Sequence, residues 1–289
     1  MLYGAVETGG TKIVCAIFNE AGQLLDSVRF PTVTPDSVVK EIADYYTSSG
    51  IVSLGIGSFG PVDLDVTSPT YGYILDTPKA DWNHCPFLNK LKERLDIPIA
   101  IDTDVNCACL GEMTYGAAQG MKTAIYITIG TGIGVGVGIG GDTLKGMLHP
   151  EAGHILIRRN KADTYKGKCP YHADCFEGLA AGPAIGERAG RPAYEIPVGD
   201  SAWELEADYI GQAVTNYILS YSPERIVLGG GVMEQLHLFP MIRQKVKEYM
   251  NGYIKTAQMD DLDNYIVPSG LNGNQGILGA FCLAKKAVK

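Results

Sequence analysis

Glu7-Thr8-Gly9-Gly10-Thr11-Lys12 separates two apolar segments, residues 2–7 and 12–18. Apolar, β-branched runs on both sides of a glycine pair predict a β-hairpin. Two glycines at the turn let backbone N–H groups and the hydroxyls of Thr8 and Thr11 face a phosphate, with a positive charge from Lys12 nearby. An ordinary hairpin also uses glycine to satisfy its turn geometry, so this stretch alone leaves both interpretations open.

A second turn, Gly130-Thr131-Gly132-Ile133-Gly134, repeats this pattern between predicted strands at residues 124–129 and 135–139. Glycine alternates along the second of these strands, which leaves one face bare and indicates that another group approaches it closely. Predicted strands and helices alternate after each turn. Two such hairpins, each opening an α/β half, indicate duplication of one fold with the two copies facing each other.

The length of 289 residues favours two domains with a cleft between them. We place the boundary near residue 118, between an N-terminal α/β domain (1–118) and a C-terminal α/β domain (119–274). The final helix, within residues 275–289, is expected to pack back on the first domain.

The net charge of −8, with acidic and basic residues interspersed, offers no concentrated positive field, so neither nucleic acid nor a membrane surface is an expected partner. The N-terminus lacks a basic region followed by an apolar core, and no apolar stretch approaches the ~20 residues that span a bilayer, which predicts a cytoplasmic protein. Seven cysteines, of which only Cys169 and Cys175 look paired by spacing, argue against a disulfide scaffold.

Two common nucleotide motifs do not apply. Gly136-x-Gly138-x-x-Gly141 lies inside a predicted strand and opens no helix, and no Gly-x4-Gly-Lys-Ser/Thr stretch occurs. A third glycine turn, Gly229-Gly230-Gly231-Val232-Met233, follows a predicted strand. It either borders an adenine or ribose or is a plain strand-to-helix turn.

Asp102 and Asp104 follow a predicted strand at residues 98–101, and Asp104 opens the next predicted helix. The carboxyl edge of a sheet is where α/β proteins place ligands, and a helix N-terminus favours the ionised carboxylate. The alternative role for either aspartate is a simple helix N-cap.

Cys169, His172 and Cys175 stand at i, i+3 and i+6, a spacing that lets a loop wrap around one metal ion, and His154 could complete a tetrahedral site. The alternative is a pair of free thiols and a structural histidine. A closed set of four ligands would be structural, because no position stays open for water.

These motifs resemble those of the ROK family of sugar kinases and sugar-responsive repressors, whose fold is the duplicated actin-like/ribonuclease H-like ATPase architecture. The resemblance runs from residue 4 to about residue 280. It is carried by both glycine turns, Gly55-Ile56-Gly57-Ser58-Phe59-Gly60-Pro61-Val62-Asp63, Asp102-Thr103-Asp104-Val105-Asn106, Glu151-Ala152-Gly153-His154 and Gly229-Gly230-Gly231-Val232.

The resemblance implies that Asp104 is the catalytic base, because it matches the family's catalytic aspartate. Glu7 stands where the family usually has aspartate and is the candidate Mg²⁺ ligand. The implied ATP-binding residues are Gly9, Gly10, Thr11, Lys12, Gly130, Thr131, Gly132, Pro183, Gly229, Gly230, Gly231, Val232 and Met233. The implied sugar-binding residues are Gly60, Pro61, Asn83, Thr103, Asp104, Glu151, His154 and Glu177. Glu177 has the alternative role of a first-turn helix charge.

The cysteine loop is shorter than the usual family loop and resembles the variant of ROK fructokinases, which implies a structural Zn²⁺ held by His154, Cys169, His172 and Cys175. The implied activity is an ATP-dependent hexose kinase with Mg²⁺, and fructose, converted to fructose 6-phosphate, is the leading substrate. Mannokinase and glucokinase activities are alternatives. A sugar-sensing ROK regulator without kinase activity is another, but it needs an N-terminal DNA-binding domain, whereas the first hairpin here starts near residue 4. The family also implies a homodimer.

Overall fold

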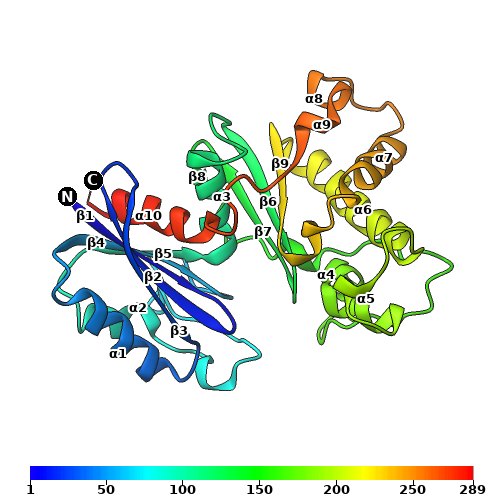
Figure 1. The fold of residues 1–289 in the computed structure, drawn as a ribbon. Coiled ribbons are helices and arrows are strands. Elements are labelled where there is room, and N and C mark those ends of the chain that lie inside the picture. Colours follow the sequence, from blue (N-terminus) through cyan, green and yellow to red (C-terminus); the bar gives the residue numbers. More distant parts are fainter. Residues whose placement is uncertain (289) are drawn as a thin grey trace. The chain divides into compact units, whose positions relative to one another are not determined.

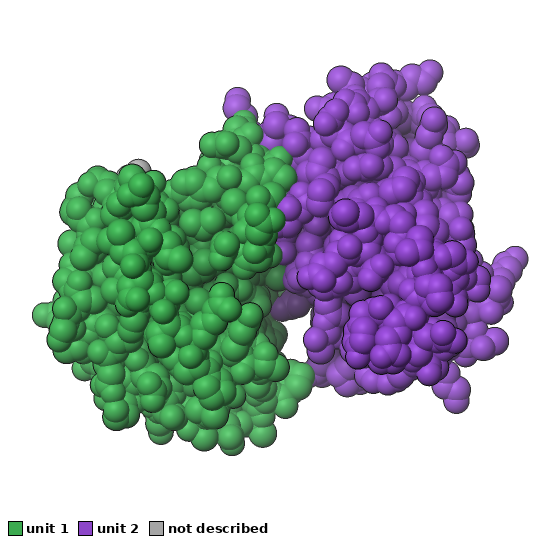
Figure 2. Space-filling model, in the orientation of Figure 1, with its two compact units in different colours: residues 1–120, 136–150, 270–289 green, residues 121–135, 151–269 purple. Residues whose placement is uncertain are grey.

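The computed structural model describes residues 1–288 and contains two compact units (Figures 1 and 2). Unit 1 comprises residues 1–120, residues 136–150 and the chain from residue 270 on. Unit 2 comprises residues 121–135 and 151–269. The domain boundary near residue 118 stays a prediction.

Unit 1 is built on a five-stranded sheet in the order β3-β2-β1-β4-β5. Its strands are β1 (Leu2–Thr8), β2 (Lys12–Asn19), β3 (Leu24–Pro31), β4 (Ile51–Ser58) and β5 (Ile99–Thr103). β1 and β2 form the predicted hairpin. β4 runs parallel to both β1 and β5, with Ser58 opposite Thr8 on one side and Thr103 on the other. The segments that follow β1, β4 and β5 therefore start at the same edge of the sheet.

Helices cover both faces of this sheet (Figure 1). One face carries α1 (Pro35–Tyr46), α2 (Phe87–Lys92) and the short 3₁₀ helix η1 (Ala80–Trp82). The other carries α3 (Asp104–Tyr115) and α10 (Gln275–Ala287), where Phe281 stacks on Phe18 with ring centroids 4.8 Å apart. Side chains of β1 alternate between the two cores, Val6 facing α1 and Ala5 facing α10, as the pleat of a strand requires.

Glycines let α10 approach its neighbours closely. A Cβ on Gly55 of β4 would lie 1.9 Å from the carbonyl oxygen of Ala280, and a Cβ on Gly279 would lie 1.6 Å from that of Cys107 in α3. Both distances are far below van der Waals contact, so a side chain at either position would push the helix away.

The second sheet has the order β10-β9-β6-β7-β8. Its strands are β6 (Thr123–Ile129), β7 (Ile133–Ile139), β8 (Asp142–Thr143), β9 (Arg225–Gly229) and β10 (Ile266–Pro268). The bare face predicted for β7 is occupied by α3 of the same chain. A Cβ on Gly136 would lie 2.2 Å from the carbonyl oxygen of Val105, and one on Gly138 would lie 2.2 Å from Met113 Sδ. Those glycines serve helix packing.

Unit 2 holds the remaining helices, of which α6 and α7 pack together. They are η2 (Ala152–His154), α4 (Phe176–Ala180), α5 (Gly182–Ala189), η3 (Ala193–Glu195), α6 (Ala202–Tyr221), η4 (Gly231–Glu234), α7 (Leu238–Met250), α8 (Ala257–Asp260) and α9 (Leu262–Tyr265). Within residues 1–288, no helix combines the length and the apolar character that crossing a membrane would require.

Candidate active site

The first glycine turn of unit 1 is tied to its neighbours through backbone groups. The N–H of Gly9 donates to the Lys12 carbonyl at 2.9 Å, and the hydroxyl of Thr32 donates to the Gly9 carbonyl at 2.7 Å. Gly10, Thr11 and Lys12 are exposed, as a phosphate site needs. The expectation that Thr8 offers its hydroxyl to a phosphate is wrong, because this side chain is fully buried and donates to Ser58 Oγ at 3.0 Å.

Glu7 lies at the N-terminus of α10, where the backbone N–H of Ile277 donates to its carboxylate. A Cβ on Gly276 would lie 2.6 Å from the Glu7 carboxyl group, so a side chain there would displace that group. Burial raises the pKa of Glu7 above its usual value, and the charges of Lys12 and Arg29 oppose that shift.

The two aspartates after β5 have different surroundings. Asp102 is 0% exposed and is fully occupied: its Oδ1 accepts from Thr103 N and Asn106 Nδ2, and its Oδ2 accepts from Thr143 Oγ1 at 2.6 Å and faces Lys145 Nζ at 3.1 Å. Asp104 is half-buried in the first turn of α3.

Neither Asp102 nor Asp104 is the N-cap of α3. Thr103 occupies that position, and its hydroxyl accepts the N–H of Asn106 at 3.1 Å. The helix terminus is therefore already capped, and Asp104 is not needed for that structural role. Asp104 is the carboxylate of this pair that retains solvent access.

Three further predicted sugar-site residues lie in unit 1. Gly60 and Pro61 follow β4 and are joined by a cis peptide bond, and the next N–H, of Val62, donates to His149 Nε2 at 3.1 Å. Asn83 follows η1, and its Oδ1 accepts the N–H of Thr77 at 2.8 Å. Burial lowers the pKa of His149, which suits a neutral ring that accepts the Val62 N–H.

The other predicted sugar-site residues, Glu151, His154 and Glu177, lie in unit 2 around η2 and α4. Glu177 Oε2 accepts the N–H of Ile133 at 3.0 Å, and its Oε1 lies 3.9 Å from His154 Nδ1. A Cβ on Gly132 would lie 2.7 Å from Glu177 Oε2, so a side chain there would displace this carboxylate. Glu151 is exposed as a residue, but burial of its carboxyl group, with the nearby charge of Glu177, raises its pKa to about 7.

A pocket of about 850 Å³ lies in unit 2 beside the second glycine turn. It gathers five of the predicted ATP-binding residues: Gly130, Thr131, Pro183, Gly231 and Val232. The other predicted ATP-binding residues of unit 2 do not line this pocket. Gly132 contacts Glu177, Gly229 lies under Tyr126, Gly230 follows β9 with a φ of +87°, and Met233 is buried.

Sequence reasoning missed the rest of the pocket wall, which comes from α5, η3 and the segment that leads into it, α6 and the end of η4. These residues include Glu187, Arg191, Tyr194, Trp203 and Gln235. They carry no local motif, because the chain brings these separate segments together only through packing. The aromatic and apolar character of such a wall suits a flat ring system.

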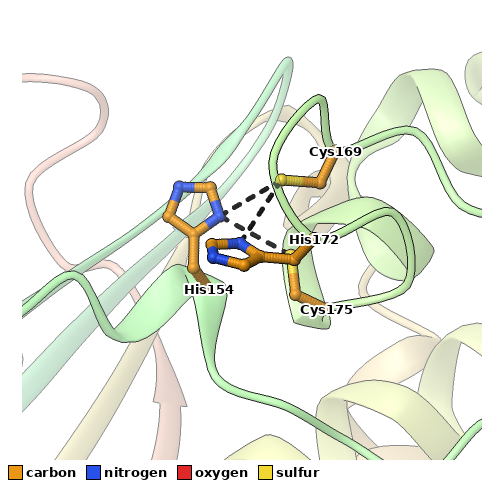
Figure 3. Close-up of side chains that lie close together, drawn as sticks. All are labelled: His154, Cys169, His172 and Cys175. Atoms are coloured by element: carbon orange, nitrogen blue, oxygen red, sulfur yellow. Dashed lines mark hydrogen bonds between the residues drawn. The ribbon is translucent and has the colours of Figure 1, made fainter. Parts of the chain in front are cut away.

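The predicted metal ligands come together in unit 2 (Figure 3). The ligand atoms of His154, Cys169, His172 and Cys175 all lie within 4.8 Å of one another. Cys169 Sγ lies 3.6 Å from His154 Nδ1 and 3.7 Å from His172 Nδ1, and Cys175 Sγ lies 3.6 Å from His154 Nδ1.

The loop backbone holds this arrangement, because Cys169 and Ala173 exchange N–H···O bonds of 3.2 and 2.9 Å. The group can hold one metal ion.

Comparison with known proteins agrees with this geometry. The model of the ROK family matches residues 3–287. A putative fructokinase of Bacillus subtilis is 49% identical over 100% of this chain and 97% of its own length, and a fructokinase of Pediococcus pentosaceus is 46% identical over 100% and 99%. The crystal structure of a ROK glucokinase from Streptomyces griseus, in complex with glucose and AMPPNP, is 25% identical, with a TM-score of 0.76 and coverage of 99% and 100%. The predicted duplicated α/β fold is confirmed, and the chain belongs to the ROK family.

Proposed function

We propose that this chain is a fructokinase that transfers a phosphoryl group from ATP to D-fructose and releases ADP and fructose 6-phosphate. Relatives named fructokinase match the whole chain, which favours fructose over the glucose or mannose of the alternatives. The observation that carries the proposal is the carboxyl edge of the sheet in unit 1. There the first glycine turn, the Gly60-Pro61 turn and Asp104 follow three neighbouring strands in register.

In this proposal Asp104 is the general base. Its carboxylate accepts the proton of the sugar hydroxyl as that oxygen bonds to the phosphoryl group. Catalysis of phosphoryl transfer depends mainly on positioning the reactants and neutralising their charge. Asp102 is a positioning residue, because its oxygens hold Thr143 and Lys145. Bound Mg²⁺ would neutralise charge on the phosphates, and Glu7 is the candidate side chain to hold it, directly or through water.

ATP is proposed to bind both glycine turns. Gly9, Gly10, Thr11 and Lys12 of unit 1 would face its phosphates, and the pocket of unit 2 would take its adenosine. The pocket volume of about 850 Å³ fits a nucleotide, and Gly130, Thr131, Pro183, Gly231 and Val232 supply backbone there without bulky side chains.

The sugar is proposed to contact Gly60, Pro61, Asn83 and Thr103 in unit 1 and Glu151, His154 and Glu177 in unit 2. Carboxylates and amides suit polyols because each can exchange paired hydrogen bonds with neighbouring hydroxyls. Thr103 has less hydrogen-bonding capacity left for a sugar than the others, since its hydroxyl already accepts the N–H of Asn106 at the start of α3.

The metal of the Cys/His group is proposed to be Zn²⁺. In a tetrahedral site with about 2.3 Å to sulfur and about 2.0–2.1 Å to nitrogen, neighbouring S and N ligands lie about 3.6 Å apart. The observed S···N separations of 3.6 and 3.7 Å match that value. Four protein ligands leave no position for water, so the ion would be structural and would fix η2 and its Glu151 against the loop that leads into α4 and Glu177.

The proposal extends to a cytoplasmic homodimer, on the strength of the family resemblance. The other candidate, a sugar-sensing regulator, would bind sugar without consuming ATP. A coupled ADP-release assay with fructose, mannose and glucose separates these functions.

Asp104→Asn should lower kcat by about 10²- to 10⁴-fold, because it removes the proton acceptor. Asp96→Asn, an exposed aspartate of the same unit, is the matched control and should behave as wild type. Absence of hexose-dependent ADP release, or full activity of Asp104→Asn, would contradict the proposal.

A further inference from the structure

A lysine that no sequence motif singled out lies against the first glycine turn. Lys79 immediately precedes η1, and its Cε lies 3.8 Å from the position that a Cβ on Gly10 would occupy. We propose that Lys79 is a second phosphate-binding cation of the ATP site, beside Lys12. This inference rests on the proposed function, because it takes the turn to hold the phosphates of ATP.

The segment around Lys79 is held firmly in place. Trp82 is buried, its Nε1–H donates to the Val33 carbonyl at 2.8 Å, and its ring meets that of Phe59 edge to face at 5.1 Å. The N–H of Thr77 donates to Asn83 Oδ1 at 2.8 Å, which closes the loop on both sides of Lys79. The backbone of Lys79 is thus positioned by buried contacts and hydrogen bonds.

The same segment borders a small pocket that adjoins the turn. The pocket has a volume of about 400 Å³ and is lined by Lys79 to Trp82 and by Thr32 to Thr34. Thr32 connects it to the hairpin, because its N–H donates to the Thr11 carbonyl at 3.0 Å and its hydroxyl donates to the Gly9 carbonyl at 2.7 Å. The lysine, the pocket wall and the turn therefore form one continuous surface within unit 1.

Gly10 has space that the protein itself does not fill. Its φ is not positive, and within residues 1–288, apart from Gly9 and Thr11 on either side of it, Lys79 Cε is the only atom within 4 Å of a Cβ built there, at an ordinary contact distance. Gly9 differs, because a Cβ there would lie 3.1 Å from the Lys12 carbonyl oxygen. Neither backbone conformation nor packing requires glycine at position 10, so the space suits a group from outside the chain, such as a phosphate.

The charge of Lys79 is available to such a group. Among residues 1–288 no carboxylate lies within ion-pair distance of its amine, although Asp81 lines the same pocket. The positive charge of Lys12, in contrast, interacts with the carboxylate of Glu7 on the other strand of the hairpin. This ammonium group, which has no carboxylate within ion-pair distance, lies beside a turn whose residues Gly10 to Lys12 are exposed, and together they can bind a polyphosphate.

The test compares Lys79→Met with Lys79→Arg and with Lys92→Met, an exposed lysine of α2 in the same unit. Titration calorimetry without sugar measures the affinities for ATP and for AMP, and steady-state kinetics measures the KM for ATP and for fructose. Lys79→Met should weaken ATP binding by about 10- to 100-fold and leave AMP binding and the KM for fructose unchanged. Lys79→Arg should recover most of the loss, and Lys92→Met should match wild type.

Three results would overturn the inference: unchanged ATP affinity in Lys79→Met, equal losses for ATP and AMP, or a change confined to the KM for fructose. The first leaves Lys79 without a role, the second indicates general damage to the fold, and the third assigns the lysine to the acceptor sugar. If wild type binds ATP but phosphorylates no hexose, the proposed fructokinase activity is wrong, and the calorimetric comparison still decides the role of Lys79.

Discussion

Replacing Glu206 with glutamine should make the protein less sensitive to rising pH. Glu206 lies on α6 and is 0% exposed, and neither of its carboxylate oxygens has a hydrogen-bond partner within residues 1–288. The nearby cation, Arg188, forms its ion pair with Asp163 instead, at 3.0 Å. Burial therefore raises the pKa of Glu206 well above its usual value, and the charge of Arg188 only partly opposes the shift.

The sign of the effect follows from proton uptake. The folded protein keeps Glu206 protonated at pH values where the unfolded chain, with a glutamate pKa of about 4.3, has lost that proton. Stability from this group is present below the unfolded pKa and is lost as pH rises toward the folded pKa. In that window the free energy of unfolding falls by up to about 1.4 kcal/mol per pH unit. Glu206→Gln removes the titrating group, so this contribution to the slope should disappear.

The measurement is urea unfolding followed by tryptophan fluorescence at several values from pH 5.5 to 8. The chain has two tryptophans, Trp82 in unit 1 and Trp203 in unit 2, so a Trp82→Phe background makes the signal report on unit 2. Glu204→Gln, an exposed glutamate on the same helix, is the matched control. Metal-ligand titration affects both proteins alike and cancels in the comparison. Equal slopes for wild type and Glu206→Gln would refute the reasoning.

Three further outcomes are expected. Cys169→Ser should lose the bound metal, seen by elemental analysis as a fall from one zinc per chain to none, and should lower the unfolding temperature; a metal-free wild type would contradict this. Gly279→Ala should lower the free energy of unfolding in urea by about 3 kcal/mol or more, because its Cβ would meet the Cys107 carbonyl at 1.6 Å. Gly199→Ala is the control, because Gly199 is exposed, has no positive φ, and a Cβ there would meet no atom within 4 Å. Lys145→Met should leave buried Asp102 without its cation and lower the free energy of unfolding by about 1–3 kcal/mol, a range reduced for solvent screening because Lys145 is 35% exposed. Unchanged stability would show that the hydrogen bond from Thr143 is enough to stabilise Asp102.

Local chemistry was enough to predict the hairpins and the clustering of the Cys/His side chains in one loop. A glycine pair between apolar runs indicates a turn wherever it occurs, and the observed β1 and β2 agree with the predicted strands to within about one residue. Cys169, His172 and Cys175 are close in sequence, so a single loop brings them together. β3 was missed, because this edge strand is exposed along nearly all its length and shows no alternation of apolar residues.

Long-range packing decided the remainder. The difference between Asp102 and Asp104 depends on Thr143 and Lys145, about forty residues away, which no pattern around the aspartates reveals. The same holds for Lys79, which meets Gly10 only after the sheet and η1 have formed. Sequence patterns report on neighbours along the chain, whereas a site is assembled from neighbours in space.

The place of α10 in the chain has a consequence during biosynthesis. Residues 270 onward are made after all of unit 2, yet Phe281 and Ala280 cover Phe18 and Ala5 on the sheet of unit 1. At about 5–20 residues per second, translation of the intervening residues 121–269 takes on the order of 10 s. For that time the nascent sheet presents an apolar face to the cell interior, so the ribosome-bound chain should be the form most exposed to chaperones and to aggregation.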